Sequence, residues 1–538
     1  MTKIKKFGLR SWAVLTTQII VFAPLGLNAK NIETKKTSQT TLELQSNWEN
    51  NTKVENFSDY LKLGRIEPPK NSGRLNLTDK ELVKIGLANS PEIRSSIYQY
   101  RQTDYEVRSA YAAYFPTITA FNTSIGQNNS NSTFEFGGEG YGNGKTREEQ
   151  RQIDTINANS TGITNYYQGL LGVQLSYNLV DIPRDLSIAQ AMESRKYYKT
   201  LISYAVKQKL QSLRLAIVSV QSADKLIKAY QNSAAFAKKA YEQILKSYQG
   251  GYATKIDVDN YFALYNGYQA NVAASMATRQ AAVSQLLAQM SWPQTIDIEM
   301  SDNLEPPKDW PIDLANSIKL ADKNSELIQN LIIQSKINKI QAKSELANYL
   351  PVVSLNAYGY LENQNGQIYI GDPPGSTNRS TNSSISLNLS WTLFDGLGNL
   401  NNSRAYKQSM YSFEQQSESQ KYSVQQSVHS GYAAIKGNLT AFKLNSKAYE
   451  SLQQLTKLTM KGYQSGYNTV FDLVNAQQDN VSSLIGIIQN NTTVNSNLIQ
   501  MQTNTGAYAC ENQSVKYACD LLVAFESKDF TKTTEKKQ

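Results

Sequence analysis

Three segments of this chain recur later in the sequence in the same order, and this repetition constrains the fold more than any other feature. One segment recurs after 214 residues, one after 215 and one after 235. The offsets of 214 and 215 differ by one residue across a long span, which indicates an internal duplication of a unit of strands and helices. The offset of 235 is larger because the first copy has a longer loop between Pro116 and Leu175. The paired segments are Ala113–Pro116 with Asn348–Pro351, Leu175–Asp181 with Leu389–Asp395, and Ser247–Thr254 with Gly462–Thr469.

The middle segment of each copy alternates apolar and polar residues. Such period-two alternation predicts a β-strand with one apolar and one polar face. A partner strand is predicted after Pro116 and after Pro351, with Gly/Asn/Ser-rich loops near 125–168 and 362–383. The apolar positions are Leu171, Val173, Leu175, Tyr177 and Leu179 in the first copy and Ile385, Leu387, Leu389, Trp391 and Leu393 in the second.

A long helical pattern follows the second strand of each copy. From Leu213 to Tyr248, apolar residues recur at alternating spacings of three and four, which is the seam of a coiled coil. As one helix, the segment 184–249 would extend ~100 Å. Glycines at positions 250, 251 and 466 then predict tight turns, after which a second helix returns. We therefore expect two long helical hairpins.

The first 29 residues have the pattern of a signal peptide. Four positive charges precede an apolar run from Trp12 to Leu27, and Leu27–Ala29 is a plausible cleavage site. Its removal would lower the net charge from +9 to +5. No dense Lys/Arg patch remains, so a nucleic-acid partner is not expected. The polar segment 30–76 is predicted to be a flexible leader.

Few residues are suited to catalysis or metal binding. His429 is the only histidine, and the two cysteines, Cys510 and Cys519, lie close together near the C-terminus. In an oxidising compartment we expect these cysteines to form a disulfide. The sequence therefore favours a protein that is not an enzyme and has no metal or cofactor.

The number of predicted strands has a consequence if they cross a membrane. Ten alternating residues rise ~33 Å, which suits a tilted strand that spans the apolar band of an outer membrane. Four strands cannot close a lipid-facing barrel, because such barrels begin at about eight strands, and open sheet edges are not tolerated in lipid. Several chains would then have to share one barrel. The alternative is a half-buried sheet of a soluble protein.

Four doubled features resemble the TolC-type outer-membrane channel family, and the resemblance extends from Leu77 to about Gly506. The first is a helix start, the second a Tyr-x-Pro before a strand, the third a strand ending of the type L-F-D-G, and the fourth a tip of the type G-x-x-T-x-x-D. They correspond to Leu87–Glu92 with a weaker echo at Asn324–Glu326, to Tyr114–Pro116 and Tyr349–Pro351, to Leu393–Gly396 and Leu179–Ile182, and to Gly251–Asp257 and Gly466–Asp472.

The resemblance implies an α+β membrane protein that acts as a homotrimer. Three chains would form a twelve-stranded β-barrel in outer-membrane lipid and a twelve-helix tunnel in the periplasm. The tunnel would meet a periplasmic adaptor and an inner-membrane transporter, and would export small molecules or proteins by tripartite efflux or type I secretion. The expected plan is repeat 1 over 77–290, a linker over 291–311, repeat 2 over 312–506, and a C-terminal tail over 507–538.

The resemblance also implies roles for the hairpin tips. The matching residues for adaptor docking are Gly251, Tyr252, Thr254, Gly466, Tyr467 and Thr469, and those for the channel aperture are Asp257, Tyr463, Asn468 and Asp472. Asn468 replaces an arginine of the family pattern, and Asn475 stands where a second acidic ring could lie. We therefore expect a closed tip held by uncharged hydrogen bonds. The alternative is that the docking residues only form turns and the aspartates only cap helices.

Two other classes of protein have long helical hairpins. A periplasmic adaptor carries them within compact β-domains, without duplicated strands that have an apolar outer face. A secreted structural coiled coil does not explain the matched strand–loop–strand units. The duplication therefore favours the channel over both.

Overall fold

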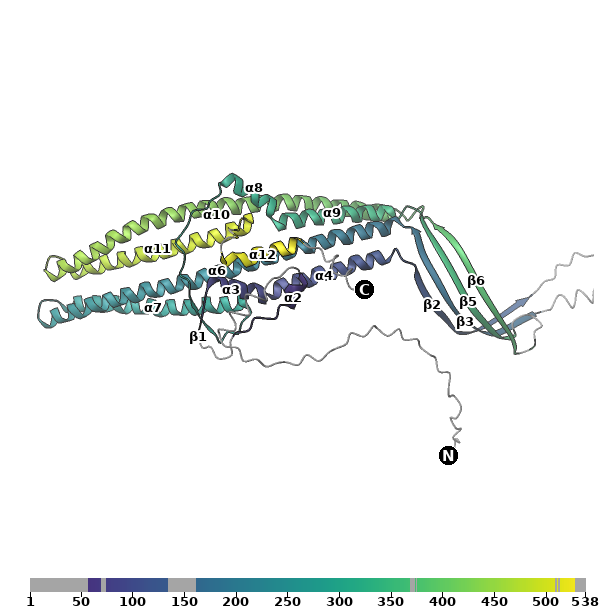
Figure 1. The fold of residues 1–538 in the computed structure, drawn as a ribbon, viewed down its shortest axis with the longest axis horizontal. Coiled ribbons are helices and arrows are strands. Elements are labelled where there is room, and N and C mark those ends of the chain that lie inside the picture. The colour runs from purple at the N-terminus through teal and green to yellow at the C-terminus, as the bar shows by residue number, and fades with distance from the viewer. Residues whose placement is uncertain are drawn as a thin grey trace, which may run out of the picture. The chain divides into compact units, whose positions relative to one another are not determined.

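Long helices and long strands make up most of the chain in the computed structural model (Figure 1), which describes residues 57–68, 74–133, 161–367, 373, 375–508, 510 and 513–527. The expected signal peptide and residues 30–56 of the expected leader lie outside these residues. The helices and strands of the first half are α2 (Phe57–Lys62), β1 (Arg74–Leu77), α3 (Asp79–Asn89), α4 (Pro91–Ala112), β2 (Thr117–Thr133), β3 (Thr161–Val180), α6 (Ile182–Gln249) and α7 (Lys255–Met290).

The second half has the same kinds of elements in the same order. Two shorter helices, two strands and two long helices follow one another in both halves, so that α8 corresponds to α3 and α11 corresponds to α7. This order agrees with the interpretation of an internal duplication. The elements are β4 (Asp297–Met300), α8 (Leu314–Asn324), α9 (Glu326–Ala347), β5 (Val352–Gln367), β6 (Ser376–Ser390), α10 (Gly398–Gln464), α11 (Val470–Thr505) and α12 (Gln513–Ser527).

The helix boundaries follow from local capping chemistry. Thr78 and Glu81 form a reciprocal capping box at the start of α3, and Ser90 caps α4 with a proline at its first position. Asp181 caps α6, which begins two residues before the predicted segment and runs for 68 residues, or ~100 Å. None of the helices in the described part of the chain is long and apolar enough to cross a membrane.

The four long strands form one antiparallel sheet in the order β2-β3-β5-β6. Cross-strand partners alternate between two kinds of row, with register shifts between Thr123 and Gly126 and between Asn178 and Val180. One row joins Ile118, Leu175, Ala357 and Ile385, and the next joins Thr117, Ser176, Asn356 and Ser386. The sheet therefore has one face with an apolar band and one polar face, as the sequence alternation predicts.

The strands are longer than the sequence suggests. They contain 17, 20, 16 and 15 residues, and they continue into the Gly/Asn/Ser-rich segments that the sequence predicts as loops. The loop boundaries near 125–168 and 362–383 are therefore wrong. Strand pairing uses backbone groups, so polar side chains extend a ladder once its register is set by the apolar part.

The two helical hairpins pack against each other through a shared apolar core near their turns. Helices α6, α7 and α11 all contribute to this core, with partly buried residues from α10 around it. The small side chains on α6 allow close helix packing, as the Ala-rich seam predicts. The buried members are Ala234, Ala237, Ala240, Ile244, Val258, Tyr261, Leu264, Tyr268, Val470, Leu473 and Val481.

Several segments that were expected to be a leader, a linker or a tail form defined structure. Strand β1 pairs in parallel with β4, so that 74–77 lies beside 297–300. Tyr60 of α2 is fully buried and contacts Phe525 of α12 edge-to-face. Helix α12 packs on α3 and α6. These segments have order because their apolar side chains pack on the helices, which no local sequence pattern indicates.

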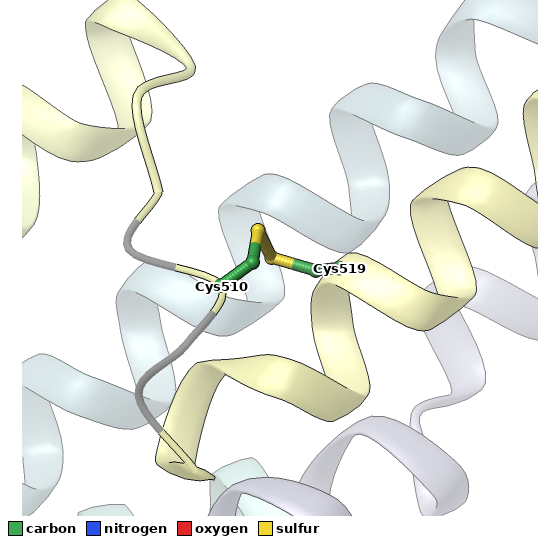
Figure 2. Close-up of a disulfide and its surroundings, with 2 residues drawn as sticks. All are labelled: Cys510 and Cys519. Carbon is green, nitrogen blue, oxygen red and sulfur yellow. A yellow bond between two sulfur atoms is a disulfide. The ribbon is translucent and has the colours of Figure 1, made fainter.

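A disulfide joins Cys510 to Cys519 in the C-terminal segment. Figure 2 shows Cys510 in the chain that leads into α12 and Cys519 on that helix. The bond closes a short loop and so restricts where α12 can lie, as the spacing of the two cysteines predicts.

Candidate functional site: the hairpin tips and the sheet

Both hairpins reverse direction through turns with the same backbone geometry. Gly251 has φ +80° and Gly466 has φ +78°, in the left-handed region that favours glycine. Each turn is closed by a backbone hydrogen bond of 2.8 Å, from Tyr252 N to Ser247 O and from Tyr467 N to Gly462 O. The two glycines are therefore required by the turn itself, whatever partner the tip has.

An aspartate caps the returning helix at each tip. Asp257 Oδ2 accepts hydrogen bonds from the backbone N and the Oγ1 of Thr254, at 2.9 and 2.7 Å, and Thr254 Oγ1 accepts from Asp257 N. Thr469 and Asp472 repeat this capping box with the same distances. These hydrogen bonds hold the pKa of Asp472 below its usual range, so its carboxylate is charged at neutral pH. Both aspartates therefore help to cap the helix that begins at their tip.

The expected aperture residues are brought together only in part. Tyr463 lies against the shared hairpin core, and burial, followed by the nearby charge of Asp257, raises the pKa of its hydroxyl. Asn468 instead lies over Gly462 of its own turn, where a Cβ on the glycine would meet its Oδ1 at 1.8 Å. Near the tips, Gln464 Nε2 of α10 donates a hydrogen bond of 3.4 Å to Gln243 Oε1 of α6. This bond joins the two hairpins.

The tips expose large side chains, of which Tyr252 and Tyr467 were expected from the sequence and Ile256 and Phe471 were not. Tyr252 and Tyr467 are 91% and 88% exposed, and Ile256 and Phe471 are 71% and 67% exposed. The last two stand 215 residues apart, which is the offset of the tip motif, so extending the repeat alignment by two positions identifies them. Large exposed apolar residues at equivalent places are typical of a contact surface.

A groove runs between α7 and α11 just behind the tips. Amide and apolar side chains of both helices line it, and Asn475 lies in it with Phe471 and Val474. The position of a possible second acidic ring is therefore occupied by an amide within a groove of mixed polarity. The α7 side of the groove is formed by Asn260, Ala263, Leu264, Gly267, Tyr268 and Asn271.

The apolar face of the sheet is exposed over a defined height. Its residues include Ile385, which is 79% exposed, with Leu387 and Leu389 on the same strand. Along β5 the apolar positions run from Val353 to Leu361, which is ~26 Å of strand. This height corresponds to the apolar band that faces lipid in outer-membrane proteins. Further exposed members are Ile118 on β2, and Leu171 and Val173 on β3.

A Tyr–Asp hydrogen bond in each half joins the segment after α4 or α9 to the beginning of α6 or the segment before α10, where the helices meet the sheet. Tyr349 Oη donates to Asp395 Oδ1 at 2.5 Å, and Tyr114 Oη donates to Asp185 Oδ1 at 2.8 Å. These bonds lower the pKa of both carboxylates. In the first half the aspartate of the strand-end motif, Asp181, caps α6 instead, and its neighbour Asp185 makes the contact.

The fold matches solved outer-membrane channels. It resembles a membrane protein from Pseudomonas aeruginosa, with a TM-score of 0.62, 17% identity, and coverage of 79% of this chain and 90% of that one. The outer membrane protein VceC of Vibrio cholerae matches with a TM-score of 0.62 and 13% identity, over 80% of this chain and 96% of that one. The CmeC outer membrane channel of Campylobacter jejuni matches with a TM-score of 0.62 and 11% identity, over 82% of this chain and 89% of that one. No curated protein sequence matches the chain.

A family match agrees with this fold. Residues 318–507 match the family described as outer membrane efflux protein, and they extend from α8 to just beyond the end of α11. The match covers the second half of the chain, in which the L-F-D-G and tip motifs are best preserved. The family match, over residues 318–507, and the shared fold agree with the resemblance to TolC-type outer-membrane channels.

Proposed function

We propose that the chain forms a homotrimeric channel-tunnel that exports substrates across the periplasm and the outer membrane. It would be the outer component of a tripartite efflux or type I secretion system, with a periplasmic adaptor and an inner-membrane transporter as partners. The driving energy would come from the transporter, and this chain would provide a passive conduit.

The observation that carries this proposal is the pair of open edges of the sheet. Strands β2 and β6 are the two edges, and each is paired on one side only in the described chain. Lipid cannot satisfy the unpaired backbone groups, so an edge in the apolar band must pair with another strand. If β6 of one chain pairs with β2 of the next, three chains close a barrel of twelve strands.

The helices support assembly with further copies. Helix α10 has 67 residues, yet few of them are buried in the single chain. An unpartnered face of this length indicates an interface, because large exposed apolar residues are otherwise costly. In the trimer this face would meet a neighbouring hairpin along the tunnel. The large exposed apolar residues of α10 are Tyr411, Tyr422, Leu444, Leu455 and Leu458.

We assign the tips to partner docking and to the aperture. The docking residues would be Gly251, Tyr252, Thr254, Gly466, Tyr467 and Thr469, to which we add Ile256 and Phe471. Three Asp472 carboxylates in a narrow opening would concentrate cations, with Asp257, Tyr463 and Asn468 nearby. Both small molecules and proteins suit such a conduit as cargo.

The assembly is tested by the native mass of the full chain, extracted in mild detergent from separated membranes. A trimer in the outer-membrane fraction is expected, and a monomer in the soluble periplasmic fraction would overturn the proposal. The aperture is tested by Asp472→Asn in planar bilayers. We expect weaker block by divalent cations from the tip side, and unchanged block would reject the aperture assignment while leaving the trimer intact.

A further inference from the structure

The four strands of the sheet carry only two charged residues. Glu362 lies on β5 and Arg379 lies on β6, and the described parts of β2 and β3 contain none. Glu362 pairs with Ser380 and belongs to the polar face, whereas Arg379 pairs with Asn363 and belongs to the opposite face. The two charges therefore stand at the same height but point to different sides of the sheet.

Glu362 is held by donors from three strands. Its Oε1 accepts hydrogen bonds from Gln168 Nε2 of β3 at 2.5 Å and from Gln364 Nε2 at 2.7 Å, and its Oε2 accepts one from Ser380 Oγ of β6 at 3.2 Å. All three donors are uncharged, and no cation contacts Glu362 in the described chain. These bonds fix the position of the carboxylate and add no positive charge beside it.

Aromatic residues lie beside the carboxylate on the same face. Tyr360 and Tyr358, two and four positions before Glu362 on β5, stack with their ring centroids 5.8 Å apart. Tyr360 pairs with Gly172, where a Cβ would meet Tyr360 Cβ and a ring carbon of Phe121 at 2.6 Å. The glycine thus makes room for an aromatic row next to the carboxylate, and this row lowers the polarity around the charge.

Glu362 also stands at the outer end of the apolar band. Leu361, the preceding residue, is the last apolar position of β5 on the exposed face, and Asn363 and Asn365 follow it on that face. In the barrel of the proposed function, this height is the outer mouth, and the polar face is the lumen. Three copies of Glu362 would then form a ring of fixed negative charge around the exit.

We propose that Glu362 is a selectivity residue that makes the outer mouth of the barrel prefer cations over anions. This inference rests on the proposed trimeric channel and adds a second charged layer, ~100 Å or more from the tip. The carboxylates attract cations and repel anions in a narrow passage, and the aromatic row strengthens their field.

The test is the reversal potential of the purified full chain in planar bilayers under a tenfold KCl gradient. We expect the wild type to be cation-selective, Glu362→Gln to lower the ratio of K⁺ to Cl⁻ permeability at least about twofold, and Glu362→Lys to lower it further. Arg379→Gln is the matched control, because it removes one charge at the same height from the outer face, and it should leave the ratio unchanged.

A second measurement covers the case in which these variants fail to assemble. The described cysteines are paired in the disulfide, so Glu362→Cys introduces a free thiol. A positively charged thiosulfonate added to conducting channels should lower the permeability ratio, and a negatively charged one should raise it. A ratio that neither the reagents nor Glu362→Gln change would overturn the selectivity role. A wild type without any conductance would instead overturn the proposed channel itself.

Discussion

Asp79 offers a test of the energetics of the helical part of the chain. Its backbone N donates to Asp302 Oδ2 at 2.8 Å, and Gln221 Nε2 donates to both of its carboxylate oxygens at 3.0 and 3.2 Å. Burial, and then the charge of Asp302, raises the pKa of Asp79 to about 6 from 3.8. This difference is about 3 kcal/mol of destabilisation per chain when the carboxylate is ionised, or about 2 kcal/mol after allowance for residual solvent exposure.

The direction with pH follows from proton linkage. Between about pH 4 and pH 6 the folded chain binds more protons at Asp79 than the unfolded chain, so this group lowers stability as the pH rises. Asp79→Asn removes the charge and keeps an oxygen that can accept from Gln221. We therefore expect the variant to be more stable than the wild type by about 2 kcal/mol at pH 8, and by less than about 1 kcal/mol at pH 4.

The assay is denaturant unfolding of the detergent-solubilised chain, followed by tryptophan fluorescence at both pH values. Asp479→Asn is the control, because Asp479 is exposed on α11 and should change stability little at either pH. An Asp79→Asn variant that is equally stabilised or destabilised at pH 4 and pH 8 would refute the assignment of a buried, repelled carboxylate.

Three further outcomes are expected. Gly466→Ala forces a side chain into the left-handed region and should destabilise the tip by about 1–2 kcal/mol, seen as faster proteolysis there, whereas Gly437→Ala within α10 should not. Cys519→Ser should lower the free energy of unfolding of α12 by about 2–3 kcal/mol, measured by hydrogen exchange. Tyr349→Phe should raise the pKa of Asp395, measured by infrared titration, because the tyrosine is the main cause of its lowered value.

Features with a local period were predictable from the sequence. The helix expected over 184–249 is found at 182–249, because its apolar spacing persists over many turns. The sheet faces follow from alternation, and the capping aspartates follow from the T-x-x-D pattern. In each case the interaction that fixes the element lies within a few residues of the chain.

Features that depend on distant partners were not predictable. Strand β1 exists because it pairs with β4, more than two hundred residues later, and neither tetrapeptide has a distinctive pattern. The same holds for Tyr60, which is buried under a C-terminal helix. The sequence places Glu362 in a predicted loop. The donors from β3 and β6 that hold its carboxylate come together only through the register of the strands, which the local sequence does not show.

The capping aspartates show why local chemistry alone does not decide function. At each tip the cap uses one oxygen, Oδ2, which accepts both hydrogen bonds from the preceding threonine. Oδ1 of Asp257 and Oδ1 of Asp472 have no hydrogen-bond partner among the described residues. One carboxylate can therefore cap a helix and still present charge to a tunnel, so the structural and the electrostatic roles do not compete. Asp472→Asn separates them, because the amide oxygen can keep the cap while the charge is lost.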